Sequence, residues 1–240
     1  MGANVFDEVA RDYERIHNRS LPPGVRSDEF VAQKAAQLVA WIGAAYRGRE
    51  LRYLDFGCGN GRLFRHLLES PGLRPLFDRG HLLLFGFDTS AESLKQAEAI
   101  AGAGNVCLVD DFARFPRGVR FDFVISCNVF HHIPPTARDA VVDRLADWAA
   151  PGARLVIWEH NPVNPFARLI VRICPFDREA RLVTLPAARR LFGRRFGYRR
   201  HAFVNVFPPG LQRLAPLRRI EQRLARVPVG AQYWVMFEAP

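Results

Sequence analysis

The sequence predicts one α/β domain built on a doubly wound parallel sheet. Between residues 51 and 160, apolar strand-like runs alternate with helix-like segments. A glycine-rich turn follows the first strand at 57–61, and Asp88 follows the second. The 240 residues suit one such domain with additions. We therefore expect an N-terminal helical cap over residues 1–48 and the sheet domain over residues 49–240.

Two helices are expected in the cap. Apolar residues recur near helical spacing between residues 4 and 20, and Leu21-Pro22-Pro23-Gly24 ends that helix. Ser27 could cap a second helix that runs to about Tyr46. Acids in its first turn favour the helix dipole. Both helices are expected to cover a ligand site on the sheet.

The first strand, 53–56, runs into Gly57-Cys58-Gly59-Asn60-Gly61 and then a helix over 62–69. Glycines there allow a sharp turn and let a ligand lie against backbone N–H groups. A dinucleotide fingerprint would need a glycine where Arg62 stands, and no Gly-Lys-Ser/Thr of a P-loop follows. Asp55, just before the turn, suits a ligand with an ammonium group and no pyrophosphate.

Acids also follow the next two strands. Residues 81–87 end at Asp88, where a carboxylate is placed to accept hydrogen bonds from both ribose hydroxyls; helix capping alone is the alternative. Thr89 or Ser90 would cap the next helix, 91–101. The third strand, 105–109, is followed by Asp110-Asp111-Phe112.

The fourth and fifth strands complete the parallel part. Residues 121–127 run into a segment, 128–135, that contains His131 and His132. A helix from 135 or 136 to about Ala150 should stop at Pro151-Gly152. The fifth strand, 154–158, ends in Glu159-His160-Asn161.

The pattern Asp55-x-Gly57-x-Gly59-x-Gly61 resembles motif I of class I S-adenosylmethionine (SAM) methyltransferases. An acid followed five positions later by proline, here Asp111 and Pro116, is similar to a later pattern of that family. The segment from Asn128 resembles motif IV of the ubiquinone- and menaquinone-biosynthesis type. The resemblance covers 51–160, with a plausible completion at 198–238.

The resemblance implies a Rossmann-like seven-stranded sheet whose sixth and seventh strands are 198–207 and 231–238, the seventh inserted antiparallel between the fifth and sixth. It leaves extra lid segments at about 161–183 and 208–230. It also implies SAM as cofactor, with Asp111 at the adenine amino group, Asp110 as a possible substitute, and Tyr13 over the methionine end or in the core. The expected cofactor residues are Asp55, Gly57, Cys58, Gly59, Asp88, Thr89, Asp110, Asp111, Phe112, Asn128 and Tyr13.

Methyl transfer from SAM is an in-line displacement, so the protein mainly has to position the two reactants. A base is needed only where the acceptor must lose a proton. His131 and His132 are candidate bases because imidazole changes charge near neutrality, although one of two adjacent histidines normally faces the core. Glu159 and His160 compete for the role, and together with Asn161 they are the expected substrate contacts.

Charge divides the chain unequally. Residues 1–162 contain 19 Lys and Arg and 20 Asp and Glu, whereas residues 163–240 contain 15 Arg and 4 acids, which gives net charges of −1 and +11. Between 211 and 227, leucine, isoleucine and valine recur every three or four residues with arginines between them. This pattern indicates a membrane-surface helix, a clamp for an amphipathic anion, or a lid with solvated arginines.

Four cysteines without metal-type spacing, no signal core and no spanning apolar run predict a reduced cytoplasmic protein without a metal. The leading hypothesis is a methyltransferase that acts on a small or lipid-like, possibly anionic acceptor. One alternative is an RNA methyltransferase that uses the arginine-rich third; another is a non-catalytic SAM-fold binding protein. The sequence leaves the acceptor and the oligomeric state open.

Overall fold

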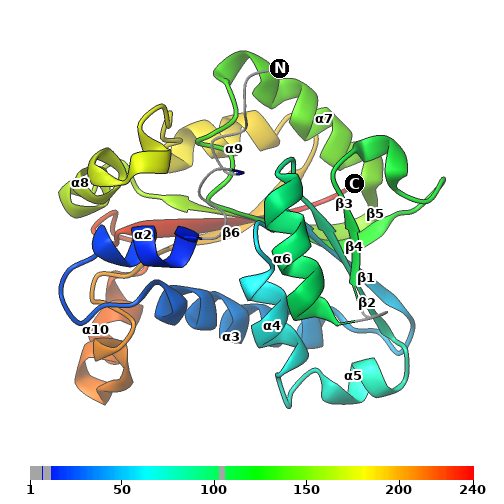
Figure 1. Ribbon diagram of the computed structural model, residues 1–240, viewed down its shortest axis with the longest axis horizontal. Coiled ribbons are helices and arrows are strands. Elements are labelled where there is room, and N and C mark those ends of the chain that lie inside the picture. The colour runs from blue at the N-terminus through cyan, green and yellow to red at the C-terminus, as the bar shows by residue number, and fades with distance from the viewer. Residues whose placement is uncertain (1–6, 8–11, 103–105) are drawn as a thin grey trace.

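The computed structural model describes residues 7, 12–102 and 106–240 (Figure 1). Its centre is a seven-stranded sheet in the order β3-β2-β1-β4-β5-β7-β6. The strands are β1 Leu51–Phe56, β2 Leu82–Phe87, β3 Val106–Val109, β4 Phe121–Cys127, β5 Ala149–His160, β6 Gly197–Val204 and β7 Gln232–Glu238. Strands β1 to β5 pair in parallel, and β7 is antiparallel to both β5 and β6. The predicted fold class and strand order are confirmed.

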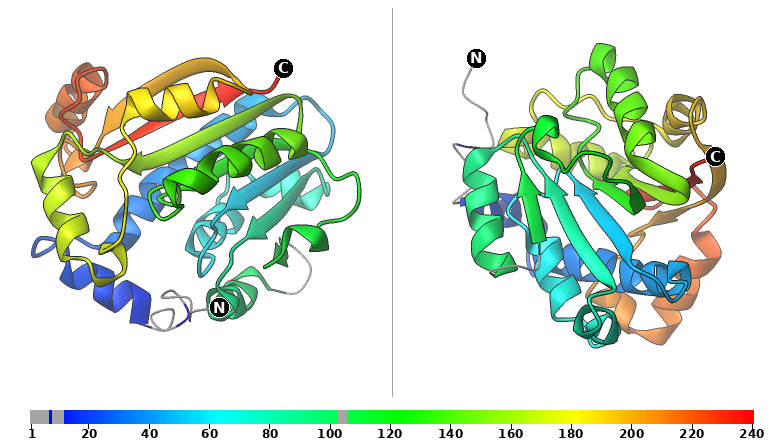
Figure 2. Two further views of the ribbon diagram at one scale, coloured as in Figure 1. Left: turned by 90° about the horizontal axis from the view of Figure 1, so that it is seen from above. Right: turned by 90° about the vertical axis from the view of Figure 1, so that its right-hand side faces the viewer.

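Helices cover both faces of this sheet (Figures 1 and 2). The described helices are α2 Tyr13–Arg19, α3 Ser27–Ala45, α4 Arg62–Leu68, α5 Arg74–Asp78, α6 Ala91–Ala101, α7 Arg138–Trp148, α8 Pro165–Ile173, α9 Leu185–Phe192 and α10 Ala215–Leu224. Among the described residues, no helix is both long enough and apolar enough to cross a membrane.

Two apolar cores follow from this layering. On one face, α3 and α4 pack Leu38, Ile42 and Phe64 against the sheet, and all three are fully buried. On the other face, α7 and α9 contribute Leu145 and Phe192 to the second core. Because both faces are covered, the central strands are apolar almost throughout their length. Polar side chains at the strand ends are therefore the exceptions that mark a site.

Several element boundaries differ from the prediction. Strand β5 begins at Ala149, which pairs with Phe121, and contains Pro151-Gly152; a register shift follows before Arg154 pairs with Phe123. Ser27 is the first residue of α3 and not its cap. The lid segment 161–183 contains α8. The later part of the predicted first helix is α2, and the rest of it lies largely outside the described residues.

Candidate active site

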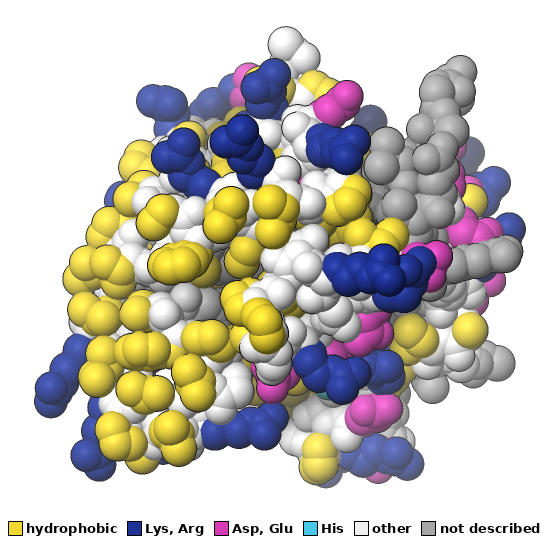
Figure 3. Space-filling view, turned by 60° about the vertical axis from the view of Figure 1, so that its left-hand side comes forward, with side chains coloured by type: hydrophobic (Ala, Val, Ile, Leu, Met, Phe, Trp, Pro, Cys, Tyr) yellow, Lys and Arg dark blue, Asp and Glu magenta, His cyan; other side chains and the backbone are white. Residues whose placement is uncertain are grey.

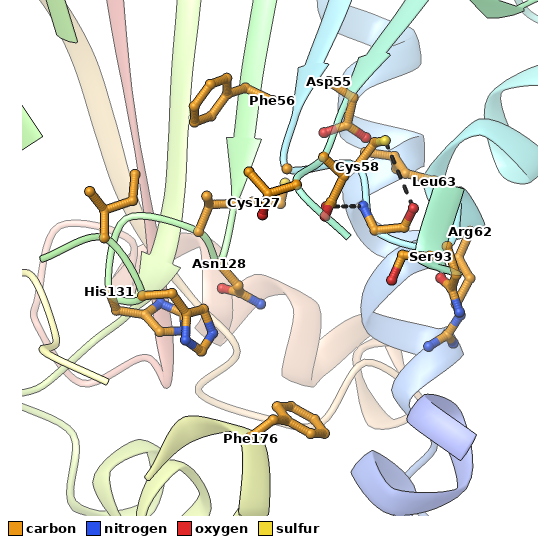
Figure 4. Close-up of a pocket in the computed structure, with 18 of the residues that line it drawn as sticks. Asp55, Phe56, Cys58, Arg62, Leu63, Ser93, Cys127, Asn128, His131 and Phe176 are labelled. Carbon is orange, nitrogen blue, oxygen red and sulfur yellow. Dashed lines mark hydrogen bonds between the residues drawn. The ribbon is translucent and has the colours of Figure 1, made fainter. Parts of the chain in front are cut away.

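A cavity of about 1170 Å³ opens at the carboxyl ends of the parallel strands. The glycine turn forms one side of it, and residues after β4 and β5 form the other (Figure 4). Segments α2, α3 and α8 contribute the remaining wall with side chains such as Phe30, Lys34 and Ile170. The cavity lies where ligands bind in open α/β sheets. The N-terminal cap and the lid segment 161–183 therefore meet the strand ends in one place, whereas no residue of the lid segment 208–230 lines the cavity.

The glycine turn is held by the neighbouring strand. The N–H groups of Gly57 and Cys58 donate to the Phe87 carbonyl at 2.7 and 3.0 Å. Gly57, Gly59 and Gly61 all have positive φ. A Cβ on Gly57 would lie 2.2 Å from Val129, whereas one on Gly59 would meet nothing within 4 Å. Gly59 therefore has open space beside its backbone, as a bound ligand would require.

Asp88 fixes the other side of the turn. Its Oδ2 accepts the Gly59 N–H at 2.8 Å and its Oδ1 accepts the Ser90 N–H at 2.9 Å. Burial raises the pKa of Asp88, and these backbone hydrogen bonds oppose the rise. Asp88 thus orients the loop, and its carboxylate lines the cavity.

Asp55 lies at the bottom of this cradle. Burial and the charge of Asp88 raise its pKa to about 7, and the cation Lys34 acts against the rise. A buried carboxyl with no opposite charge in direct contact is stabilised as a carboxylate when a cationic ligand binds beside it. Contact of Asp55 with an ammonium group stays a prediction.

The opposite wall contains a network of two histidines and two carboxylates. His131 Nδ1 lies 2.5 Å from Glu159 Oε2, and its Nε2 lies 3.6 Å from Asp177 Oδ1. His132 Nε2 lies 3.2 Å from the same Asp177 oxygen. Ligand atoms of His131, His132 and Asp177 lie within 4.8 Å of one another, a spacing that could hold a metal ion.

Two histidines that line the cavity, His131 and His160, differ in charge. Burial lowers the pKa of His131, but Glu159 and Asp177 outweigh it and raise the value to about 9. Burial and the neighbouring His131 lower the pKa of His160 to about 3. His131 is therefore a cation near neutrality and His160 a neutral imidazole.

Residues 54–155 match a protein family described as Methyltransferase domain. An uncharacterized methyltransferase of Geobacillus kaustophilus (strain HTA426) is 28% identical over 152 residues, which cover 63% of this chain and 56% of that relative. The match thus spans little more than half of the relative's length.

Solved structures share the fold. Magnesium protoporphyrin IX methyltransferase from Synechocystis PCC 6803 with bound SAM aligns over 100% of both chains, with a TM-score of 0.59 and 20% identity. N-methyltransferase NodS from Bradyrhizobium japonicum WM9, in complex with S-adenosyl-l-homocysteine, aligns over 87% of this chain and 86% of its own, with a TM-score of 0.57 and 13% identity.

Residues 54–155 thus match a methyltransferase domain, and the fold around them is that of class I SAM-dependent methyltransferases of known structure. The residues of the cavity fit SAM, the molecule bound in the Synechocystis structure. Besides the open space at Gly59, the buried Oδ1 of Asn128 has no hydrogen-bond partner among the described residues. Asn128 has a φ of 56° at the end of β4, and its side chain projects into the cavity (Figure 4). The narrower resemblance to the ubiquinone type stays a prediction.

Most predicted cofactor residues of the methyltransferase domain meet at this cavity. The residues that line it are Asp55, Gly57, Cys58, Gly59, Asp88, Thr89, Asp110, Asp111, Phe112 and Asn128. The side chain of Tyr13 lies outside the described part of the structure. Asp111 accepts the Ala113 N–H at 2.9 Å, and Asp110 pairs with Arg114 at 2.8 Å. Both acids line the cavity, and their contact with adenine stays a prediction.

Two predicted substrate contacts need correction. Glu159 is fully buried, accepts the N–H groups of Val129 and Phe130, and pairs with His131. Asn161 is buried, and its side chain binds the backbone of residues 163, 228 and 230. Neither side chain lines the cavity; backbone groups and, for Glu159, the His131 ring contact their polar atoms instead. His160 does line it.

The sequence interpretation missed Lys34 and Asp177. Lys34 is 6% exposed, lines the cavity and makes no hydrogen bond or ion pair with the described residues. Lys34 lies one helical turn from both Val31 and Leu38, so the sequence pattern places a lysine on the apolar face of α3. This exception to the apolar pattern indicates a functional residue. Asp177 gave no such signal, because its partners lie far away in the sequence.

Proposed function

We propose that this protein transfers a methyl group from SAM to a lipid-like small molecule bound in the same cavity. One observation supports this most strongly: the glycine cradle and the histidine network face a common space whose remaining wall is largely apolar, with Leu21, Phe30 and Ile170 among its residues. SAM supplies an electrophilic methyl group. Asp88 would hold its ribose, Asp111 and Phe112 its adenine, and Asp55 and Asn128 its methionine end.

In this proposal the main contribution of the protein is to position the cofactor and the acceptor. The cradle fixes the cofactor, and the apolar wall excludes water and aligns the acceptor, an effect worth roughly 7–11 kcal/mol of an activation barrier. His132 is the proposed base, because Asp177 lies 3.2 Å from its Nε2 and can orient the ring. His131, also predicted as a base, is a poorer choice because both of its ring nitrogens face carboxylates.

The pairing of arginines near β6 weakens that part of the RNA alternative. Arg194, Arg195 and Arg199 pair with acids of the domain, and Arg189 stacks on Tyr198 with 4.2 Å to the ring centroid. These side chains are already engaged, so the arginines near β6 offer a weak phosphate surface.

Calorimetry with SAM tests the cofactor assignment. Asp88→Ala removes the proposed ribose acceptor and should weaken SAM binding by at least about tenfold. Gly59→Arg should abolish binding, since its side chain fills the open space. Gly80→Arg is the matched control. Gly80 also has a positive φ, and a Cβ there would meet nothing within 4 Å, but it lies outside the cavity. Unchanged affinity in both site variants would reject the assignment.

Turnover tests the base. For an acceptor that must lose a proton, His132→Ala should lower kcat by about a hundredfold or more while SAM affinity stays unchanged. Hydrolysis of SAM to free methanol and methyl transfer to an acceptor are separated by product analysis, with and without a chelator. A normal kcat in His132→Ala would remove this residue from the mechanism, and a chelator-sensitive kcat would point to a metal ion at the network.

A further inference from the structure

Exposed apolar side chains gather on one side of the molecule. Of ten exposed large hydrophobic residues among those that the structure describes, nine lie within 163–173 or 211–229. Phe166 is 71% exposed and Leu214 56%. We call these nine residues the apolar face. Figure 3 shows this side as a broad yellow area with dark blue arginine and lysine side chains around it. A soluble monomer rarely exposes such a large patch without a partner.

The two segments form one surface because they are joined by hydrogen bonds. Asn161 donates to the carbonyls of Pro228 and Gly230 at 3.0 and 2.8 Å, and Asn164 donates to that of Val229. These contacts hold the chain after α10 against the start of α8. Val163 and Val229, both exposed, consequently belong to the same patch.

Charge identifies the occupant of the apolar face. Its two segments contain seven arginines and one acid, Glu221. Glu221 is buried and accepts the N–H groups of Val206 and Phe207, so its charge faces inward. None of the seven arginines pairs with an acid within the described ranges, whereas three near β6 do. An apolar stripe with unpaired arginines fits an anionic lipid surface better than a neutral one.

Helix α8 links this face to the cavity. Ala167 and Ile170 on its inner side line the cavity, while Phe166 and Leu169 on its outer side are exposed. A single helix therefore separates the apolar cavity wall from the exterior. We propose that the apolar face docks on an anionic phospholipid bilayer, from which the acceptor enters the site beneath α8. This inference rests on the proposed function for its acceptor but not for the docking itself.

Vesicle co-sedimentation tests the docking. The native chain should sediment with vesicles of phosphatidylcholine and phosphatidylglycerol at 3:1 and stay largely in solution with phosphatidylcholine alone. Phe166→Asp with Leu169→Asp, and separately Arg218→Glu with Arg223→Glu, should each weaken partition by at least about tenfold. Arg79→Glu with Arg117→Glu is the matched control, since it makes the same charge change on exposed arginines elsewhere.

The outcomes separate the possibilities. Native-like partition of either face variant, or no partition of the native chain, overturns the proposal. A native dimer that Phe166→Asp with Leu169→Asp converts to a monomer, without vesicle binding, assigns the face to a second copy and also overturns it. Circular dichroism checks that each variant folds. SAM calorimetry without vesicles separates the two claims: intact SAM binding with no docking rejects the membrane inference alone.

Discussion

At the level of single residues, Asp55 and Lys34 are two buried groups of opposite charge that line the cavity. Burial raises the pKa of Asp55 to about 7 and lowers the pKa of Lys34. Without a ligand, both charged forms are disfavoured by desolvation. The methionine end of SAM carries one ammonium and one carboxylate group, so we expect it to compensate both residues at once.

The affinity for SAM should consequently depend on pH. Below about pH 7 the Asp55 carboxyl binds a proton in the ligand-free protein and must lose it to pair with the ammonium group. Affinity should therefore fall as the pH drops below 7, by up to about tenfold per pH unit, and level off above 7. Calorimetry between about pH 5.5 and about pH 8.5 covers this change in SAM affinity.

The variant Asp55→Asn provides the control, because its amide does not titrate. Its affinity should be low and nearly independent of pH over the same interval. Asp88 also has a raised pKa, so a slope that persists in Asp55→Asn would assign the proton to Asp88. A flat curve for the native protein would contradict the proposed pairing.

At the level of elements, Asn161 connects three parts of the chain. It follows β5, and its amide binds the carbonyls of residues 228 and 230, while its Oδ1 accepts the Val163 N–H at 3.1 Å. This one side chain fixes where α8 begins relative to β7. The lid is thereby attached to the sheet at the rim of the site.

Replacing Asn161 with alanine should lower the free energy of unfolding by about 2 kcal/mol, because three backbone groups lose their partner in a buried place. Urea unfolding measures this change. Thr184→Ala is a useful comparison, since it removes one cap hydrogen bond, to Ala187, on α9 away from the site. An Asn161→Ala chain as stable as the native one would show that water replaces these bonds.

Strands were easier to predict than the lid helices. The runs that became β1, β2 and β4 are apolar and are followed by Gly57, Asp88 and Asn128, so local pattern sufficed. Helix α8 was not predicted, because Phe166, Leu169 and Ile173 face outward and give the helix no ordinary buried stripe. The start of β5 was placed too late because Pro151-Gly152 reads as a stop, and only pairing with β4 reveals the strand.

The same distinction holds for the site. Asp55, Gly59 and Asp88 could be predicted because each lies at or just beyond the carboxyl end of a strand, and the carboxyl ends of parallel strands meet. The contact of Asp177 with His131 and His132 depends on how the segment after α8 folds back over the sheet. No local sequence pattern encodes the distance between Asp177 and the two histidines, so His131 and His132 could be predicted but Asp177 could not.

For the molecule as a whole, the cradle and the apolar face should respond to different ligands. S-adenosylhomocysteine should slow amide hydrogen exchange at 57–62 and 88–90, and anionic vesicles should slow it at 163–173 and 211–229. The sheet between them, already hydrogen-bonded on both sides, should change little. Exchange measured by mass spectrometry separates these regions; protection of the same peptides by both ligands would contradict two separate surfaces.

The position of β7 also bears on how the protein is made. It pairs with β5 and β6 on its two sides, although residues 232–238 leave the ribosome after both neighbours. Until then β5 has an open edge, and β6 has no place in the sheet. During synthesis the place between β5 and β6 must stay unfilled until β7 is made, so the pairing of β7 completes the sheet. A chaperone that shields the β5 edge would therefore raise the yield of folded protein.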